Sequence, residues 1–351
     1  MHQRYLLYAE QNYAFSILRP LQSEVLRRGS SPHWYLAGND VNPKFLRPSE
    51  RRLATIDEVK RWNPDAVLVP GNLVPGFIPG LKVAVFHGFN VAKATRSDAR
   101  GHFNIRGCFD LYCTQGPETT GPFERLASRY GYFRVVETGW PALDPVFSQG
   151  KRFATVRNGK PKILFCSTFT AALSSARHLV NTVKELSISG DWDWLVQFHP
   201  KMPRDIVEAY RDMQGPHLRF VETDDVLPLL EEADVMLCDT SSMIPMFLAL
   251  HKPVVTFRNQ SRGSKKHLLD VRDPREIKPA IRAALDPKEE LLEHISAYVA
   301  NIHPYRDGRS SERVLDAVEE MLRNGREGLK RKPWNLFRNL KERKKLGYWK
   351  P

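Results

Sequence analysis

The sequence predicts an α/β protein built from two similar halves, each with a parallel sheet. Short apolar, β-branched segments alternate with helical patterns at a spacing of roughly 25 residues, which is typical of parallel strands joined by right-handed crossovers. The chain of 351 residues is too long for one ordinary core and suits two domains. A polar stretch rich in Gly, Lys and Arg, residues 148–161, interrupts the alternation before it restarts.

In the first half, apolar and β-branched runs predict six strands: Arg4–Ala9, His33–Ala37, Ala66–Val69, Lys82–Phe86, Leu111–Thr114 and Arg134–Glu137. Apolar residues at helical spacing predict three helices: Phe15–Arg28, Thr55–Trp62 and Thr120–Tyr130. Gly29 ends the first helix and Asn63-Pro64 ends the second. Pro20 lies inside the first pattern, so that helix is expected to be kinked or to begin late.

The second half repeats the alternation. The expected strands are Ile163–Cys166, Trp194–Phe198, Leu218–Val221, Val235–Cys238 and Val254–Phe257. The expected helices are Ala176–Leu186, Asp205–Met213, Val226–Glu232, Met243–Leu250, Pro274–Leu285, Lys288–Asn301 and Ser311–Leu322. These elements predict a domain over 1–147, a linker over 148–161, a second domain over 162–302, a helical segment 303–325 that packs back toward the first domain, and a basic aromatic tail over 326–351.

The composition, 42% hydrophobic and 26% charged, is that of a folded protein. No apolar run is long enough to span a bilayer, and no export signal is visible at the start. The four cysteines lack the paired spacing of a zinc or redox motif, so reduced thiols in the cytoplasm are expected: Cys108, Cys113, Cys166 and Cys238. Dinucleotide-binding, Walker and serine-nucleophile motifs are absent from the sequence, as is any set of residues with metal-ligand spacing.

The net charge of +13 is concentrated at the C-terminus. Residues 326–351 hold ten Lys and Arg against two acidic residues, interleaved with Trp334, Phe337 and Trp349. Basic residues with bulky aromatics suit an anionic membrane surface. The alternatives are a solvated tail and a contact with nucleic acid, for which no accompanying binding signature exists.

Polar clusters follow five of the expected strands. They are His87-Gly88, Gln115-Gly116, Ser167-Thr168, His199-Pro200 and Asp239-Thr240-Ser241-Ser242. In tandem α/β halves, ligands bind at the carboxyl ends of the strands, across a cleft between the halves. Asp239 to Ser242 stand between a buried strand and an apolar helix, where backbone N–H groups and the helix dipole favour a phosphate. The alternative is that Asp239 or a serine merely caps a core helix.

Two histidines at strand ends suit proton transfer or phosphate binding. His87 precedes Gly88, which lets a ligand approach the backbone. The plain alternative for His87 and for His199 is a histidine bonded within its own loop. In the run Asp307 to Arg313, Ser310 or Ser311 is expected to cap a helix, and Arg309 and Arg313 are candidates to reach an anion.

In their order, these motifs resemble the CDP-glycerol:poly(glycerol phosphate) glycerophosphotransferase family of teichoic-acid synthesis. The resemblance covers roughly residues 80–325, and the segments that carry it are Phe86–Gly88, Thr138–Asp144, Ile163–Phe169, Phe198–Pro200, Ala233–Ser242, Lys252–Val254 and Asp307–Arg313. It departs from the family's pattern after His-Gly, where Phe89 to Lys93 follow, and at Ser167-Thr168, where the family has Pro-Thr.

The resemblance implies a GT-B fold of two Rossmann-like domains with no required metal or other cofactor. It implies that His87 deprotonates the acceptor hydroxyl, that His199, Thr168, Ser241 and Ser242 hold the transferring phosphate or the pyrophosphate, and that Asp239 orders their loop. The reaction would move glycerol phosphate, or a related polyol phosphate, from CDP-glycerol to a membrane-associated glycan or polymer and release CMP. The expected location is the inner face of the cytoplasmic membrane, held there by residues 326–351, with no nucleic acid as partner.

Two alternatives remain at this stage. The first is a nucleotide-sugar glycosyltransferase or UDP-N-acetylglucosamine 2-epimerase-like enzyme of surface polysaccharide synthesis. The second is a basic protein that binds membranes or nucleic acid without catalysis. Removal of residues 326–351 is expected to abolish the function of such a binding protein, whereas an enzyme is expected to keep its chemistry on soluble substrates.

Overall fold

The computed structural model describes residues 2–89, 101–148, 159–223 and 225–349. Two compact units divide the chain. Unit 1 comprises Met1–His87, Phe103–Gly150 and His303–Pro351, and unit 2 comprises Gly88–His102 and Lys151–Ile302. Most of the expected linker, residues 149–158, lies outside the described residues.

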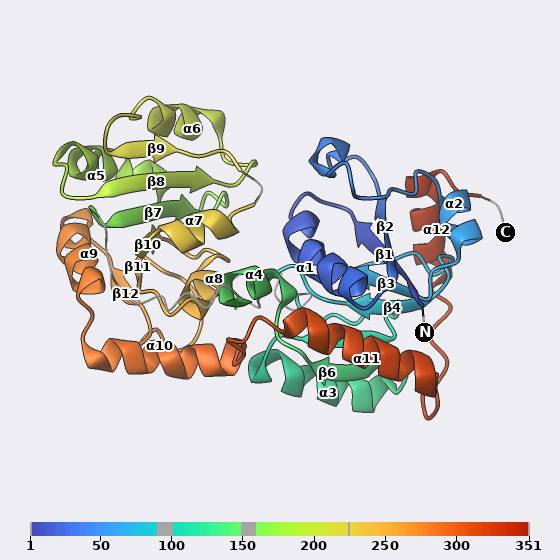
Figure 1. Cartoon of the computed structure of the whole chain (residues 1–351). Coiled ribbons are helices and arrows are strands. Elements are labelled where there is room, and N and C mark those ends of the chain that lie inside the picture. The colour runs from blue at the N-terminus through green and yellow to red at the C-terminus, as the bar shows by residue number, and fades with distance from the viewer. Residues whose placement is uncertain (1, 90–100, 149–158, 224, 350–351) are drawn as a thin grey trace. The chain divides into compact units, whose positions relative to one another are not determined.

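Unit 1 holds a sheet that has six parallel strands within the described residues (Figure 1). The strands are β1 (Arg4–Ala9), β2 (Ser31–Leu36), β3 (Ala66–Val69), β4 (Leu81–Ala84), β5 (Leu111–Thr114) and β6 (Arg134–Glu137), in the spatial order β2-β1-β3-β4-β5-β6. The central strands are buried along most of their length because helices cover the sheet. All six sequence-predicted strands of this half are confirmed, with shifts of one or two residues at some ends.

The helices of unit 1 are α1 (Ala14–Arg27), α2 (Ile56–Trp62), α3 (Pro117–Tyr130), α4 (Asp144–Ser148), α11 (Ser310–Asn324) and α12 (Leu336–Leu346), with the 3₁₀ turns η1 (Pro43–Phe45) and η3 (Pro141–Leu143). Helix α1 begins at Ala14 and runs through Pro20, so the expectation of a late start is wrong. Helix α3 begins at Pro117, three residues before the predicted start, because proline suits the first turn of a helix.

Unit 2 repeats the architecture with strands β7 (Lys162–Ser167), β8 (Asp193–Phe198), β9 (Leu218–Phe220), β10 (Val235–Cys238), β11 (Val254–Phe257) and β12 (Leu269–Val271). Their spatial order is β12-β11-β10-β7-β8-β9, and the paired strands are parallel. The sequence does not predict the edge strand β12, because it is three residues long and only half-buried. The other five predicted strands of this half are confirmed.

The helices of unit 2 are α5 (Ala176–Ile188), α6 (Arg204–Arg211), α7 (Leu227–Glu232), α8 (Ile244–Ala249), α9 (Ile277–Leu285) and α10 (Glu289–Ile302), with the 3₁₀ turn η4 (Pro274–Glu276) ahead of α9. Helix α8 is shorter than the sequence predicts and begins at Ile244, because residues 242–243 form a turn. Within the described parts of the chain, no helix is both long and apolar enough to cross a membrane.

The segment after residue 302 returns to unit 1, where α11 packs against α1. Arg28 at the end of α1 forms ion pairs with Asp316 (2.8 Å) and Glu319 (3.0 Å) of α11. Neither Ser310 nor Ser311 caps α11 with its side chain, which corrects the sequence-based expectation. Instead, the carboxylate of Asp144 accepts hydrogen bonds from their two backbone amides, at 2.8 and 2.6 Å.

The motif Thr138 to Asp144 fits closely against this returning segment. The amide of Trp140 donates to Nε2 of His303 at 3.0 Å. Gly139 has φ +81, and a Cβ there would lie 2.5 Å from the Oγ of Ser310. Gly308 has φ +66, and a Cβ there would lie 3.0 Å from the carbonyl oxygen of Asp144. Gly308 therefore serves a close approach of two backbones, whereas Gly139 leaves room for the side chains of the returning segment. The two motifs together form a structural joint.

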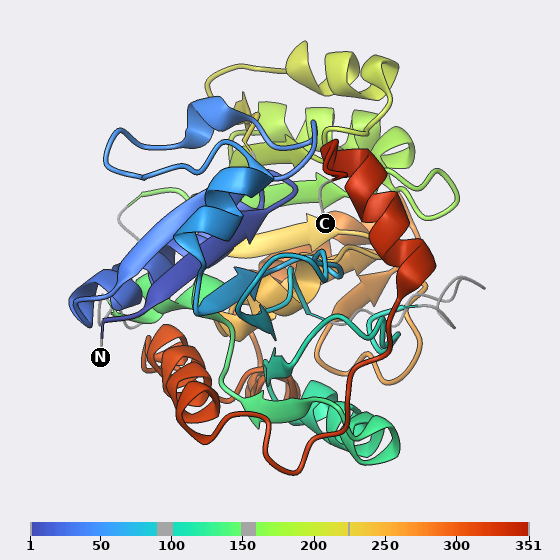
Figure 2. The same ribbon diagram turned by 90° about the vertical axis from the view of Figure 1, so that its right-hand side faces the viewer.

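Residues 326–349 are a folded part of unit 1, which corrects the expectation of a separate tail. Figure 2 shows the chain leaving α11, passing α3 and rising to α12. The carboxylate of Asp110, which is 3% exposed, pairs with Arg326 and with Lys332 (2.8 Å). Farther along, the hydroxyl of Tyr348 accepts from Nζ of Lys60 on α2 at 2.9 Å.

These contacts predict that removal of residues 326–351 destabilises unit 1. Without Arg326 and Lys332, the Asp110 carboxylate would be a buried charge with no cation beside it, and breaking such a pair costs about 3–5 kcal/mol. We expect a lower urea midpoint for the truncated chain, with partial recovery when Asp110→Asn is added to the truncation. An unchanged midpoint would contradict the structural role of the segment.

Candidate functional site

Three neighbouring strands of unit 2 end in the polar clusters predicted from the sequence. Strands β10, β7 and β8 are adjacent in the sheet, and they lead to Asp239–Ser242, Thr168 and His199 respectively. Adjacent strands lie about 4.8 Å apart, so the three strand ends fall within roughly 10 Å along one edge. The structure therefore brings the predicted phosphate-binding groups of unit 2 together.

The carboxylate of Asp239 is the centre of this edge. It is fully buried and accepts hydrogen bonds from the Ser167 hydroxyl (2.5 Å), the Thr168 amide (3.0 Å), and both the amide (2.9 Å) and the hydroxyl (3.0 Å) of Ser175. Ser175 directly precedes α5, so one side chain fixes the loop after β7 and the start of that helix. The carbonyl of Asp239 in turn accepts from Nδ2 of Asn259 at 3.0 Å.

Burial raises the pKa of the Asp239 carboxyl, while the hydrogen bonds from Ser167, Ser175 and Thr168 oppose that rise. All of these bonds run toward the β7–α5 loop. Asp239 is therefore not a cap of α8, which has no side-chain cap and only six residues. The expectation that Asp239 caps this helix is therefore wrong, since the N–H groups that Asp239 arranges belong to the loop after β7. A phosphate site at the turn before α8 stays a prediction.

The hydroxyls of this edge have different surroundings. Ser167 is buried, and its Oγ contacts Asp239, the Ser174 hydroxyl (2.9 Å) and the Ala176 amide (3.2 Å), so its bonding capacity is taken up inside the protein. Thr240 Oγ1 accepts from the Gln260 amide at 2.9 Å and so ties the loop after β11 to the site.

Two serines follow in the turn before α8. Ser241 Oγ accepts from the Met243 amide at 3.2 Å, and Ser242 is exposed. A hydroxyl that accepts one bond still has its own proton to donate. Both side chains therefore have donor capacity to offer a ligand.

His199 is exposed directly after β8, and its Nδ1 accepts from the Lys201 amide at 3.0 Å. In the neutral imidazole the proton then resides on Nε2, which can donate to a phosphate oxygen. The ring packs against Phe169, with the ring centroids 4.6 Å apart. This aromatic contact links the loop after β7 to the loop after β8.

His87 lies in unit 1, after β4. Its neighbour Phe86 has φ +58, a strained conformation for a bulky residue, and Phe86 O accepts from Nε1 of buried Trp140 at 3.2 Å. His87 is an exposed residue, and its ring lies tilted against that of Tyr13, with 5.6 Å between the centroids.

The surroundings of His87 favour the neutral imidazole. Partial removal from water lowers the pKa of His87, and the charge of Arg106 lowers it further, although a hydrogen bond to the backbone of Pro70 opposes the shift. Because Pro70 offers only a carbonyl, one ring nitrogen donates to it. The other nitrogen can then take up a proton, as a general base requires.

Two further strand-end residues have contrasting surroundings. A Cβ added at Gly88 would meet no atom within 4 Å, so the space beside that backbone is open. Gln115 is fully buried, and neither atom of its amide has a hydrogen-bond partner among the described residues.

The two arginine candidates lie in unit 1 and already have acidic partners. Arg309 forms a double hydrogen bond with Glu312, at 2.6 and 2.8 Å. Arg313 pairs with Asp307 and stacks over the ring of Tyr305, 4.0 Å from its centroid. These contacts assign both arginines to the turn before α11, and a role in anion binding stays a prediction.

Several residues of the site have no obvious signal in the sequence. Asn259 and Gln260 reach it through contacts that join distant segments. Phe169 and Trp140 stand in segments that carry the family resemblance, but no local pattern predicts their contacts with His199 and Phe86. Ser175 is the exception, because a serine directly before a helical pattern is a recognised capping signal. Among the described residues, no group of three or more His, Cys, Asp or Glu could hold a metal ion.

Two units with parallel sheets and polar loops at the strand ends define the two-domain α/β class called GT-B. Within that class, the chain belongs to the CDP-glycerol:poly(glycerophosphate) glycerophosphotransferase family, whose sequence profile matches residues 109–320, more than half of the chain. The match includes His199 and Asp239–Ser242, whereas His87 lies before it.

A relative of known function is the teichoic acid glycerol-phosphate primase of Bacillus subtilis (strain 168), which is 23% identical over 245 residues. The alignment covers 66% of this chain and 62% of the primase, so the chain spans less than two thirds of that relative's length.

Two solved structures share the fold. The wall teichoic acid polymerase TagF has a TM-score of 0.65 and 15% identity, over 92% of this chain and 89% of that one. The UDP-GlcNAc 2-epimerase from Neisseria meningitidis bound to UDP-GlcNAc has a TM-score of 0.61 and 13% identity, over 90% of this chain and 100% of that one. At these identities the likeness concerns the fold alone.

The Asp239 network predicts the effect of Asp239→Asn. An amide offers one acceptor oxygen and places an NH₂ group against the donors of Thr168 and Ser175, so unit 2 should lose about 2–3 kcal/mol of unfolding free energy. Thermal melts with and without inorganic pyrophosphate test this, and the variant should melt lower and lose stabilisation by the anion. Asp212→Asn, on the exposed end of α6, is the matched control. A wild-type response to pyrophosphate in Asp239→Asn would refute the organising role.

Proposed function

We propose that the protein transfers glycerol phosphate from CDP-glycerol to a hydroxyl of a membrane-associated glycan or polymer, with release of CMP. The observation that carries the proposal is the Asp239 network, which fixes the loop after β7 beside the ends of its neighbours β10 and β8, in a chain of the glycerophosphotransferase family. A phosphate bound there would meet backbone N–H groups, hydroxyls and an imidazole N–H, which suits an anion rather than a neutral sugar.

The donor side of the proposal uses unit 2. Thr168, Ser241 and Ser242 offer hydroxyls, and His199 offers Nε2–H, to the non-bridging oxygens of the donor's phosphates. Ser167 and Asp239 act behind them as positioning residues, since their polar atoms contact each other and the backbone. Thr240 positions the neighbouring loop through Gln260.

The acceptor side uses His87 as general base. The acceptor oxygen attacks the β-phosphorus in line, a new P–O bond forms, the P–O bond to CMP breaks, and the acceptor proton passes to His87. Positioning and electrostatic stabilisation supply the rate enhancement. The strained turn at Phe86, held by Trp140, supports this role because strain of this kind is retained where the direction of a side chain matters.

His87→Ala and His199→Ala are each expected to lower the rate of CMP release about 100-fold or more, because a general base or a phosphate ligand is lost. Since the pKa of His87 is lowered in the folded protein, the basic form persists below the ordinary histidine value of about 6.5. The acid limb of kcat/KM should therefore lie below that pH in the wild type.

His2→Ala and His178→Ala, on the surfaces of units 1 and 2, are the matched controls. Wild-type turnover in both His87→Ala and His199→Ala would end the proposal. So would stronger thermal stabilisation by UDP or GDP than by CDP, which would favour the nucleotide-sugar enzyme.

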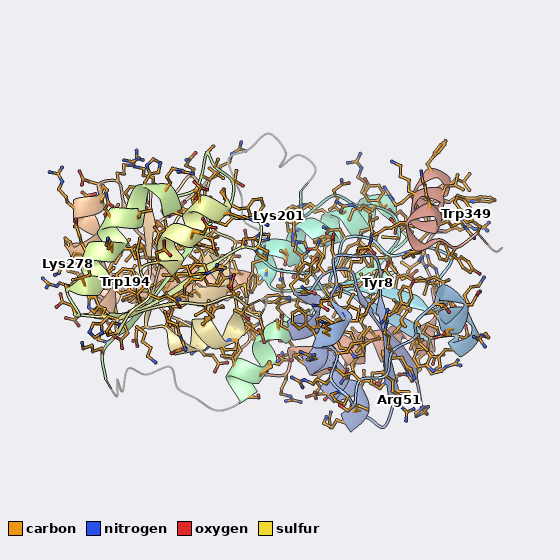
Figure 3. The ribbon with its side chains drawn as sticks, turned by 90° about the horizontal axis from the view of Figure 1, so that it is seen from above. Tyr8, Arg51, Trp194, Lys201, Lys278 and Trp349 are labelled. Atoms are coloured by element: carbon orange, nitrogen blue, oxygen red, sulfur yellow. The ribbon has the colours of Figure 1, made fainter. Side chains whose placement is uncertain are left out.

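We also propose that helix α12 and its flanks bind an anionic membrane surface. The outward side is apolar and basic, with large exposed side chains at Trp334, Leu336, Phe337, Leu340 and Trp349. The exposed bases beside them are Arg331, Lys341 and Lys344, and Arg331 lies over the Trp334 ring. Figure 3 marks Trp349 at the periphery of its unit, next to α12.

The inward side of α12 carries the polar residues. Arg338 donates to the carbonyl of Arg106, Asn339 Oδ1 accepts from the Gly76 amide (3.2 Å), and Lys345 pairs with Glu10 (2.7 Å). This polarity is the reverse of an ordinary surface helix, which buries its apolar stripe. Apolar side chains that face outward between lysines suit the boundary between lipid headgroups and acyl chains.

Replacement of the outward side is expected to release the protein from vesicles. The variant Phe337→Ser/Leu340→Ser should bind anionic vesicles about tenfold less in a sedimentation assay, since both side chains would otherwise enter the interface. The control Leu26→Ser/Ile188→Ser removes exposed apolar residues elsewhere. Equal binding by the variant, equal binding of the wild type to neutral vesicles, or a solution dimer abolished by the same substitutions would each refute the membrane assignment.

A further inference from the structure

The transferring phosphate needs a positive charge that the groups assigned so far do not supply. In unit 2 the assigned groups are neutral hydroxyls, one imidazole and the carboxylate of Asp239. The arginine candidates, Arg309 and Arg313, lie in unit 1 and pair with Glu312 and Asp307. Phosphoryl transfer relies on cations placed at the phosphate oxygens, so a cation at the strand ends of unit 2 is to be expected.

Lys201 meets this requirement by its position. It lies two residues after His199 in the loop that follows β8, and its backbone amide holds Nδ1 of that histidine at 3.0 Å. The same short loop therefore fixes the direction of the imidazole and carries the ammonium group. Figure 3 labels this side chain.

The ammonium of Lys201 is available to a ligand. The residue is exposed, and within the described residues its Nζ forms neither a hydrogen bond nor an ion pair. The ammonium lies over the ring of Phe169, with Nζ 5.9 Å from the ring centroid. An ammonium of this kind keeps three N–H donors and its charge.

Phe169 places this cation beside the imidazole. Its ring is 40% exposed, contacts His199 at 4.6 Å between centroids, and also faces Lys201. Phe169 follows Thr168, whose amide is held by Asp239, so the aromatic ring is attached to the ordered loop. A cation near an aromatic face is attracted to it, which restrains a long flexible side chain near one position.

We infer that Lys201 is a further catalytic residue, whose ammonium binds non-bridging oxygens of the transferring β-phosphate next to His199, with Phe169 as its positioning residue. This inference rests on the proposed function. Lys201 makes and breaks no covalent bond: the acceptor oxygen bonds to phosphorus, the bond to CMP breaks, the acceptor proton goes to His87, and the ammonium keeps its protons. Its charge is matched to the negative charge on the phosphate oxygens.

The test compares Lys201→Gln and Lys201→Arg with Lys184→Gln, an exposed lysine on α5 that is remote from the strand ends in sequence. We expect Lys201→Gln to lower kcat/KM for CDP-glycerol about 100-fold. Lys201→Arg should have a kcat/KM between those of the wild type and Lys201→Gln, closer to that of Lys201→Gln, because arginine keeps the charge but not the compact ammonium geometry. Phe169→Ala should lower kcat with a smaller effect, and Phe169→Tyr should restore it. The melting temperature without ligand should not change in the lysine variants, because Lys201 is exposed.

Stabilisation by inorganic pyrophosphate separates failure of this inference from failure of the proposed function. Loss of that stabilisation in Lys201→Gln supports an anion-binding role for Lys201 even if the wild type releases no CMP from CDP-glycerol. Wild-type stabilisation by pyrophosphate in Lys201→Gln overturns the inference. A kcat/KM within twofold of the wild type in Lys201→Gln also overturns it, even where the wild type is active.

Discussion

The candidate site of unit 2 depends on one buried carboxylate. Loops that leave parallel strands expose backbone N–H groups and hydroxyls that no neighbouring strand can pair, and burial makes such groups costly. Asp239 accepts from two amides and two hydroxyls of the β7–α5 loop, and these four donors compensate its charge. A neutral side chain could not accept from all four. The order of Thr168, and with it Phe169 and the contact to His199, therefore follows from a single ionised group.

In unit 1, the loop after β6 forms a structural joint instead of a candidate ligand site. The sequence from Thr138 to Asp144 and the turn before α11 look like ligand motifs, yet their polar groups bond to each other: Asp144 caps α11 and Trp140 donates to the ring of His303 through its amide. The indole of Trp140 also reaches the carbonyl of Phe86, the residue before His87. The contacts that attach residues 303–313 to unit 1 therefore also hold the turn at Phe86, directly before the proposed base His87.

The strands and the clusters at their ends could be predicted from the sequence, because burial on both faces selects uninterrupted β-branched runs and polar residues mark where burial stops. What the sequence could not reveal depends on contacts between distant segments. Asp239 reads as a local cap, but its donors lie more than sixty residues earlier in the chain. Residues 326–349 read as a tail because the charges of Arg326 and Lys332 look solvated until Asp110, more than two hundred residues away, is found beside them.

The folded C-terminus also links the outer surface of unit 1 to its proposed base. Polar contacts satisfy the inward side of α12, whereas large apolar residues on its outward side remain exposed to water. Insertion of these side chains into the interface of a lipid bilayer would remove the cost of that exposure. On the inward side, Arg338 donates to the carbonyl of Arg106, and the charge of Arg106 helps to lower the pKa of His87. Partial removal from water contributes most to the lowered pKa of His87, and the charge of Arg106 adds to it. The helix proposed to meet the membrane therefore also contacts, through Arg338, a residue whose charge favours the proton-accepting form of the proposed base.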